Sequence, residues 1–428
     1  MLWAMPAVSL YDIEQSIRRD LDGKPGDVVY FTKPMTSRHG FLTANDVTPY
    51  VVSAQTTADG PRVIEVPPAS DKVGYFGTIV DGWQTPLADV GPPGDDQGEG
   101  GKYLFLPPDY QGDVPDGYLV YRPNTYGVHL AFRPVAKNAG TAEDQSAYAK
   151  TLRIYPLAQA AAAPKTTFID AYPRRWNTLP VYDLSFFAEI NAVIQREPVL
   201  ERDKVMMAML AELGIRKGQP FKPDAATRAA LLAGVTRACD YMQDRFISPA
   251  GALTPYWQDR QWSVFNLPPA QAKAGFPFVD ADRLLMYEQA QAYFYLTYLP
   301  KVLGGGSFCL TAVKDEDGKL LNGTDTYRLG VPPDTLARDF WSIIVYSMKT
   351  QGFIEGADRV RLSSVSLDQM KRNADGTVDV LFSPVPPTGM ESNWVPTGED
   401  FFPMFRRYGP DKPLFDKTWI LADVAKFR

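Results

Sequence analysis

The sequence contains very little histidine and cysteine. Its 428 residues include two histidines, His39 and His129, and two cysteines, Cys239 and Cys309. Two histidines exclude a metal site with three imidazole ligands, and they leave a histidine-dependent nucleophilic triad only two starting points. The cysteines are too few for a disulfide framework and lack the spacing of a zinc motif. We therefore interpret both as buried thiols and predict neither a metal centre nor a cofactor.

Long apolar runs and an excess of basic side chains are also missing. Charges or glycines interrupt the longest apolar stretches, so no transmembrane segment is predicted. The 44 Lys and Arg side chains are outnumbered by 50 Asp and Glu, which gives a formal net charge of −6. Because there is no long basic run either, we do not expect a nucleic-acid partner. The 45% hydrophobic and 12% aromatic residues are ample for several cores.

The first residues, MLWAMP, lack the basic region and the long apolar core of a signal peptide. They look like the middle of an amphipathic helix that breaks at Pro6 and resumes from Ser9 to Leu21. We therefore expect the natural gene to encode residues upstream of Met1, including an export signal.

The hydrophobic period changes twice along the chain and predicts three parts. Short β-branched and aromatic runs, separated by Pro-Pro, Asp-Gly and Gly-Gly, predict an N-terminal β domain with a leading helix over residues 1–160. The pattern over 161–303 is mostly helical. After the triplet Gly304–Gly306, which we expect to be a hinge, strand patterns return and predict a β-sandwich over 304–428. The predicted fold class is therefore α+β with several domains.

Capping residues support the predicted helices. Thr141 precedes a helical pattern with an acidic first turn, and Asp183 and Asp224 precede two further helical patterns. These three positions are expected to be helix N-termini.

The stretch from Glu391 to Trp419 combines many aromatic residues with a few well-spaced charges. Glycine and proline interrupt it, so it predicts short strands joined by tight turns. Aromatic faces beside a carboxylate, an amide and a guanidinium are what a ligand pocket with a polar mouth requires. The alternative is the folded edge of a β-sandwich, whose tryptophan and tyrosine side chains fill the core.

Several motifs resemble a bacterial protein family that pairs two domains of unknown function, numbered 1254 (N-terminal) and 1214 (C-terminal). They are LTANDVTPY, DGWQTPLADVGP, GGKYLFLPPDY, KRNADGTVDVLFSP, ESNWVPT and FRRYGPDKPLFDKTW. The resemblance covers essentially the whole chain. It implies an α+β multidomain architecture that ends in a jelly-roll-like sandwich. Because members are often exported, it also implies a periplasmic or secreted location.

One motif departs from the family pattern. The family usually has Thr-Pro-Asn-x-Asp-Thr-x-Tyr near its first strands, and the matching residues here run from Thr43 to Tyr50. Val47 stands where the family has aspartate. If that aspartate carries chemistry, this protein lacks it unless neighbouring Asp46 substitutes. If it only caps a turn, little is lost.

Two carboxylates with an arginine between them can act as acid and base if burial separates their pKa values. We predict Asp81 and Glu391 as this pair, with Arg406 between them. The alternative is a bridge from Arg406 to a carboxylate that only connects domains. The residues predicted to bind substrate are Asn45, Asp46, Tyr50, Trp83, Asn393, Trp394 and Tyr408.

His129 lies within a strand pattern, where a structural histidine is the simpler interpretation. As a general base it would need Thr125 or Ser307 within hydrogen-bond reach, and no motif favours either hydroxyl.

Three functions remain open. The preferred one is an exported, hydrolase-like enzyme acting on a small or oligomeric organic substrate through carboxylate acid–base chemistry. A binding module for a glycan or an apolar ligand is the second, and a structural or assembly protein is the third. The aromatic content and the jelly-roll resemblance also predict a homo-oligomer.

Overall fold

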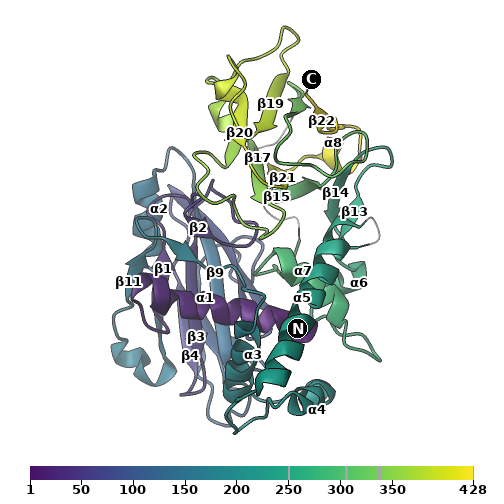
Figure 1. Ribbon diagram of the computed structural model, residues 1–428. Helices are drawn as coiled ribbons and strands as arrows, with labels where there is room; N and C mark the ends of the chain where they lie inside the picture. The colour runs from purple at the N-terminus through teal and green to yellow at the C-terminus, as the bar shows by residue number, and fades with distance from the viewer. Residues whose placement is uncertain (249–250, 304–306, 336–339, 428) are drawn as a thin grey trace. The chain divides into compact units, whose positions relative to one another are not determined.

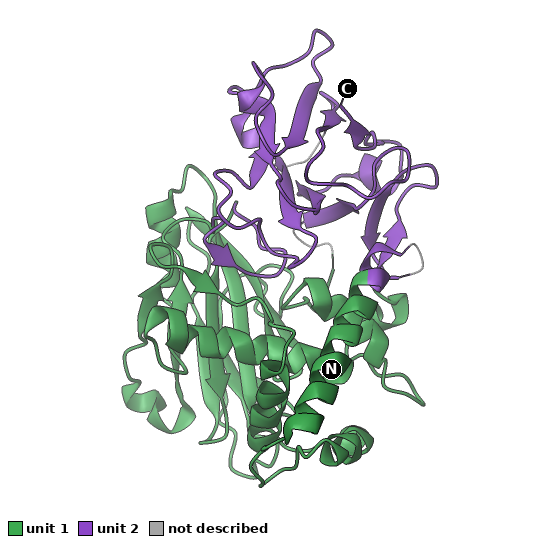
Figure 2. Cartoon of the chain, in the orientation of Figure 1, with its two compact units in different colours: residues 1–35, 47–243, 267–303 green, residues 36–46, 244–266, 304–428 purple. Residues whose placement is uncertain are grey.

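The structure is a computed structural model that describes residues 1–248, 251–303, 307–335 and 340–427. The chain forms two compact units, which Figure 2 distinguishes by colour. Unit 1 comprises Met1–Met35, Val47–Gln243 and Leu267–Leu303, and unit 2 comprises Thr36–Asp46, Asp244–Asn266 and Gly304–Arg428. The expected glycine hinge, 304–306, lies outside the described residues.

Unit 1 contains two sheets. The six-stranded sheet has the order β11-β1-β3-β9-β5-β6, and the four-stranded sheet has the order β10-β4-β7-β8. Adjacent strands are antiparallel except for the pairs β1–β11 and β7–β8. The strands are β1 (Val28–Tyr30), β3 (Val51–Thr56), β4 (Arg62–Val66), β5 (Val73–Asp81), β6 (Pro86–Val90), β7 (Gly101–Phe105), β8 (Leu119–Tyr121), β9 (Gly127–Ala136), β10 (Arg153–Pro156), β11 (Phe168–Asp170) and the short β12 (Trp176–Asn177).

Two cores hold unit 1 together. The first lies between the sheets and includes Val51 and Leu130 from the larger sheet and Ile64 and Phe105 from the smaller one. The second packs α1 and α3 against the β5–β6 turn through Trp3, Trp83 and Phe186. Figure 1 shows α1 lying across the larger sheet. The helices are η1 (Leu2–Ala4), α1 (Met5–Leu21), α2 (Ala142–Ala149), η2 (Leu157–Ala162), α3 (Ser185–Arg196), η3 (Glu201–Asp203), α4 (Lys204–Glu212), α5 (Ala225–Ile247), which runs on past Gln243, α6 (Pro269–Lys273) and α7 (Met286–Tyr295).

The predicted helix starts agree with the structure in most places. Thr141 caps α2 in a reciprocal capping box with Asp144. The Asp224 carboxylate accepts the Thr227 amide at 2.8 Å and caps α5. The predicted break at Pro6 is wrong, because α1 begins at Met5 and includes this proline in its first turn. A first-turn residue has no helical partner for its amide, so proline costs nothing there.

Unit 2 is a β-sandwich. One sheet has the order β13-β14-β15-β21-β17-β18, and the other has the order β20-β19-β16-β22. Its elements are β2 (His39–Gly40), β13 (Leu253–Pro255), β14 (Trp262–Phe265), β15 (Ser307–Ala312), β16 (Tyr327–Val331), β17 (Phe340–Ser347), β18 (Arg361–Ser363), η4 (Ser364–Ser366), β19 (Val378–Ser383), η5 (Glu391–Asn393), β20 (Trp394–Pro396), β21 (Phe401–Tyr408), α8 (Lys412–Phe415) and β22 (Ala425–Lys426).

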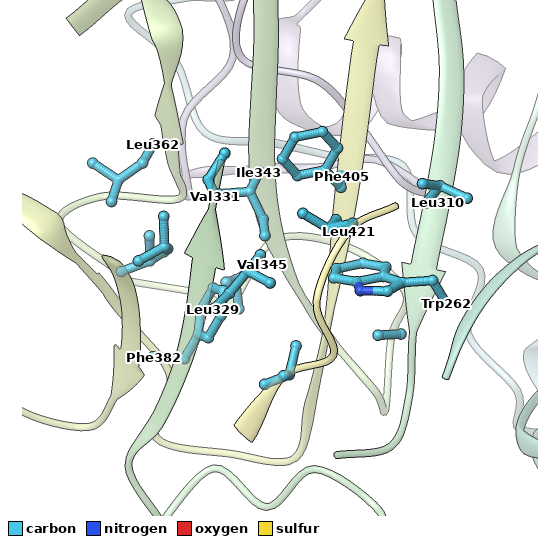
Figure 3. Packing of buried hydrophobic residues seen from close by; sticks show 14 of the residues in the cluster. Trp262, Leu310, Leu329, Val331, Ile343, Val345, Leu362, Phe382, Phe405 and Leu421 are labelled. Carbon is cyan, nitrogen blue, oxygen red and sulfur yellow. The ribbon is translucent and has the colours of Figure 1, made fainter. Parts of the chain in front are cut away.

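The sandwich core joins side chains of both sheets. Trp262, Ile343 and Phe405 come from the larger sheet, whereas Leu329 and Phe382 come from the smaller one (Figure 3). All five are buried, and burying side chains of this size is the main source of stability for such a sheet pair. The α+β class with a C-terminal sandwich, predicted from the sequence, is therefore confirmed.

The compact units cut across the three predicted parts. Strands β13 and β14 lie within the stretch 161–303, expected to be helical, but they pair with β15 in the larger sheet of unit 2. The segment Thr36–Asp46 comes from the predicted N-terminal domain and also belongs to unit 2. The predicted parts follow the changes in hydrophobic period along the sequence. The compact units depend instead on strand pairing between distant segments.

Candidate functional site

Arg406 lies in the middle of unit 2. Its strand, β21, pairs with β15 on one side and β17 on the other, so the side chain is buried despite its charge. Arg406 Nη2 donates to the carbonyl of Thr43 at 2.6 Å and to the hydroxyl of Tyr346 at 2.7 Å. The Tyr346 hydroxyl in turn donates to the carbonyl of Ala44. The central strands thus hold the backbone of the TAND motif.

Asp46 ends this segment and faces two arginines. Its Oδ2 lies 2.7 Å from Arg361 Nε, and its side chain is 13% exposed. Burial raises the pKa of Asp46 to about 6, although Arg361 and, less strongly, Arg406 favour the ionised form. Among the described residues, Asp46 Oδ1 has no hydrogen-bond partner. A carboxyl group with a pKa near 6 can serve as an acid or a base close to neutral pH, and its Oδ1 is buried without a partner among these residues.

Two more residues of the same motif were predicted to bind substrate. Asn45 is fully buried in unit 2. Tyr50 is buried in unit 1, where the guanidinium of Arg133 lies 4.9 Å from its ring centroid. Tyr50 therefore has a cation–π partner within its own unit.

Asp81 is buried at the end of β5 and stabilises the β5–β6 turn. Its Oδ1 accepts the amides of Trp83 and Thr85, each at 2.8 Å. Burial raises the pKa of Asp81 to about 6, while the two amides favour the carboxylate. Two backbone bonds to one oxygen are typical of an Asx turn, so this geometry gives Asp81 a structural task.

Trp83 and Gln84 connect the same turn to the helices of unit 1. The Trp83 and Trp3 rings pack together with their centroids 4.5 Å apart, and only 5% of Trp83 is exposed. Gln84 donates to the Pro6 carbonyl at 2.9 Å and accepts the Tyr298 amide at 3.0 Å. The DGWQTP motif therefore joins β5 to the segments before and after the sheets.

Glu391 does not resemble a buried acid. It is exposed, and its Oε1 accepts the amide of Gly389 at 2.9 Å. Backbone hydrogen bonds lower the pKa of Glu391. Arg359 supports the same turn, because its Nη1 donates to the carbonyls of Glu391, Ser392 and Trp394. Asp46 is an electrostatic partner of Arg406 in this unit.

The remaining predicted residues have structural contacts in unit 2. Asn393 is buried, and its amide nitrogen donates to the carbonyls of Lys371 and Asp379. The Trp394 indole donates to the Ser383 carbonyl at 2.9 Å. Tyr408 is buried and stacks on Phe340 with ring centroids 4.2 Å apart.

Trp394 and Arg406 are not on neighbouring strands. Trp394 lies in β20 of the smaller sheet, and Arg406 lies in β21 of the larger one. The turn between these strands carries the chain from one sheet to the other, so the two strands are not antiparallel neighbours.

The histidines and cysteines have ordinary surroundings. His39 is buried, and its Nδ1 accepts the Thr36 amide at 2.9 Å. His129 is buried in β9, and burial lowers its pKa to about 3. Thr125, a suggested nucleophile, accepts the Gly82 amide and donates to a carbonyl. Cys239 and Cys309 are free and only partly buried, so the prediction of two buried thiols is wrong.

Sequence reasoning missed two interacting acids in unit 1, the buried Asp12 of α1 and the half-buried Glu189 of α3. Burial, and then the charge of Glu189, raises the pKa of Asp12 to about 8. Asp12 has Val8 and Ser16, both buried, one turn away on either side. Because only Val8 of these two neighbours is apolar, the helix face around Asp12 gives no clear signal for this pair in the sequence.

The described residues contain neither a cluster of metal-binding side chains nor a helix that could cross a membrane. No group of three or more His, Cys, Asp and Glu side chains among them is arranged to hold a metal ion. Among the same residues, no helix combines the length and apolar character needed to cross a bilayer.

Comparison with known proteins identifies the relatives of this chain. Residues 26–156 match the family described as a protein of unknown function, DUF1254, and residues 306–412 match the one described as a protein of unknown function, DUF1214. The chain belongs to the family that pairs these two domains. None of the curated proteins matches it.

Two solved structures resemble this member of the DUF1254–DUF1214 family. The VPA0106 protein from Vibrio parahaemolyticus aligns over 100% of this chain and 98% of its own, with a TM-score of 0.56 and 16% identity. An uncharacterised protein from Burkholderia cenocepacia aligns over 98% of this chain and 87% of its own, with a TM-score of 0.40 and 13% identity. The first likeness supports the fold.

The Asp46 site contains residues from both domains of the family. Asp46 lies within the DUF1254 match, whereas Arg361 and Arg406 lie within the DUF1214 match. The site therefore combines residues from two matched segments that are far apart in the sequence.

Proposed function

We propose that this protein is a hydrolase-like enzyme with Asp46 as its acid–base group. The observation that carries the proposal is the Asp46 carboxyl beside Arg361, with a pKa of about 6 and one oxygen that has no partner among the described residues. General acid–base catalysis is most effective when the pKa of the group lies near the working pH. The substrate class is a small or oligomeric organic molecule with a hydrolysable bond.

Arg361 and Arg406 have supporting roles in this proposal. Arg361 holds the Asp46 carboxylate at 2.7 Å and sets its orientation. Arg406 adds positive charge and fixes the backbone of Thr43 and Ala44, directly and through Tyr346. Positive charge near the reacting atoms would stabilise an oxyanion that forms during hydrolysis.

Asp46 is a better candidate for the acid–base role than the pair predicted from the sequence. One oxygen of Asp81 is occupied by two backbone amides. Glu391 is exposed, and its pKa is lowered. An exposed carboxylate of low pKa holds no proton to donate near neutral pH.

The test is turnover of chromogenic substrates by the full chain and by an Asp46→Asn variant. A panel of p-nitrophenyl esters, phosphates and glycosides covers the main classes of hydrolysable bond. We expect at least one class to be turned over, with a pH–rate midpoint near 6 that Asp46→Asn removes. Glu391→Gln is the matched control, because it also neutralises one carboxylate, and it should keep the wild-type rate.

Two outcomes would overturn this proposal. One is an Asp46→Asn protein that is folded and as active as the wild type at every pH. The other is a wild-type rate without a midpoint between pH 5 and 7. If Asp46→Asn does not fold, Asp46→Glu keeps the charge and moves the carboxylate, and unchanged turnover by that variant would also contradict the proposal.

Export and self-association belong to the same proposal. A periplasmic or secreted location is supported by the habits implied by the family resemblance, and the N-terminal sequence of the protein purified from its native host would test it. A homo-oligomer is supported by the aromatic content and the sandwich architecture. Light scattering that shows only monomer at micromolar concentration would contradict it.

A further inference from the structure

A cavity of about 230 Å³ lies at one end of the sandwich in unit 2. It is bounded where β16 ends, where β17 and β19 begin, and where η4 follows β18. The lining residues are Val331, Pro332, Pro333, Thr335, Phe340, Trp341, Ser364, Leu367, Arg372, Gly376 and Val378. A cavity of this size accepts a single ring or a short chain, since an engineered cavity of about 150 Å³ holds benzene.

About half of the cavity wall is apolar, and this half is well supported by the sandwich core. Val331 and Val378 are directly opposite each other in β16 and β19, and both belong to the sandwich core. Figure 3 shows Val331 close to Ile343 and Leu362 in that core. Pro333 and Gly376 form another part of the wall, where a Cβ on Gly376 would lie 3.4 Å from the proline ring. That separation is an ordinary van der Waals contact, but the backbone at position 376 has a positive φ of 84°, which favours glycine there.

Polar atoms form the other half of the cavity wall. Ser364 Oγ accepts the Trp341 amide at 3.0 Å, but its contact with the Trp341 carbonyl is long, at 3.5 Å. Arg372 is exposed, and within the described part of the chain it makes no ion pair or hydrogen bond. It is the one charged residue among those that line the cavity.

We propose that this cavity binds a small organic acid, with its carboxylate on Arg372 and its ring or short chain between Val331, Trp341 and Leu367. A guanidinium binds a carboxylate through two parallel hydrogen bonds, which fixes the orientation of the ligand. The apolar wall buries the rest of the molecule, and the Ser364 hydroxyl supplies one more donor. A cavity that combines apolar walls with a few polar groups and one charged residue is a common form of small-molecule site.

This site is separate from the proposed acid–base group. Asp46, Arg361 and Arg406 are not among the lining residues. Binding at the cavity therefore does not rest on hydrolysis, and each proposal can fail without the other.

The experiment measures binding of benzoate and hexanoate to the full chain by calorimetry, with benzyl alcohol and hexanol as uncharged counterparts. We expect the acids to bind at least about tenfold more tightly than the alcohols. Arg372→Gln should remove this preference. Arg328→Gln changes the same charge on β16 at a half-exposed position outside the cavity, so it is the matched control and should bind like the wild type.

Two further variants complete the test. Leu367→Trp should fill the cavity and abolish binding of both acids and alcohols. Asp46→Asn should bind the acids normally, which separates this site from the proposed catalytic one. The proposal is overturned if the acids show no binding at 10 mM, if alcohols bind as tightly as acids, or if Arg372→Gln keeps the wild-type preference.

Discussion

Arg361 Nε lies 2.7 Å from Asp46 Oδ2, and the two residues come from different domains of the family. The strand β18 begins at Arg361, whereas Asp46 ends a short segment of the DUF1254 match that belongs to unit 2. The ion pair therefore connects the sequences of the two domains inside one compact unit. This arrangement gives a physical reason for both domains to occur in one chain.

The pKa of Asp46 should rise when Arg361 is removed. Arg361 is the strongest factor that favours the ionised carboxylate, and burial opposes it. In Arg361→Gln the pH–rate midpoint should move from near 6 to a higher pH by about one unit. The midpoint is measured with the best chromogenic substrate. Arg328→Gln removes an arginine elsewhere in unit 2 and should leave the midpoint in place, whereas an unchanged midpoint in Arg361→Gln would show that this pair does not control the titration.

Arg406→Lys should destabilise the protein much more than Glu391→Gln. One nitrogen, Nη2, bonds both the Thr43 carbonyl and the Tyr346 hydroxyl, and the shorter lysine side chain does not bring its ammonium to that position, so at least one buried partner loses its bond. We expect a loss of about 2 kcal/mol or more in the free energy of unfolding. The Glu391 side chain is exposed, and its replacement should cost less than about 0.5 kcal/mol. Urea unfolding measures both, and equal losses would contradict this assignment.

Asp12→Asn should make the protein less sensitive to alkaline pH. Burial and Glu189 raise the folded-state pKa of Asp12 to about 8, far above its unfolded value of 3.8. Between these values the folded state holds a proton that the unfolded state has lost, so stability falls as the pH rises through this window. The variant lacks this titration. From pH 6 to pH 8 it should lose about 2 kcal/mol less than the wild type, since each pH unit is worth about 1.4 kcal/mol.

Glu189→Gln is the matched variant for this test, because it removes the other acid of the pair and should lower the pKa of Asp12. Parallel stability curves for the wild type and both variants would show that the pair does not titrate in this range.

His129→Gln should make the protein less sensitive to acidic pH. Burial, and to a smaller extent Arg196, lowers the folded-state pKa of His129 from 6.5 to about 3. Below pH 6.5 the unfolded chain takes up a proton that the folded chain excludes, so the stability present above 6.5 is lost as the pH falls towards 3. Between pH 7.5 and pH 5.0 the variant should lose about 2 kcal/mol less than the wild type. An equal loss in both proteins, measured by urea unfolding, would mean that His129 is protonated in the fold.

Local chemistry in the sequence determined the types and ends of many elements. Thr141 caps α2, and Asp224 caps α5, because each side chain reaches an amide three residues further along the same chain. Such bonds depend only on near neighbours, so a sequence pattern is enough to predict them. The α+β class and the C-terminal sandwich were predictable for the same reason, since the change in hydrophobic period is itself a local signal.

Only the tertiary structure decided which strands and side chains meet. Trp394 and Arg406 are close in sequence but lie in different sheets, while Asp46 meets Arg361 from a distant part of the chain. A period of two shows that a strand has a buried face, but it does not name the strand or sheet that covers it. The pKa is raised at Asp46 and lowered at Glu391, and this difference also depends on the tertiary structure. Packing of the whole sandwich removes water from one carboxyl and leaves the other exposed, and no short stretch of sequence specifies that difference.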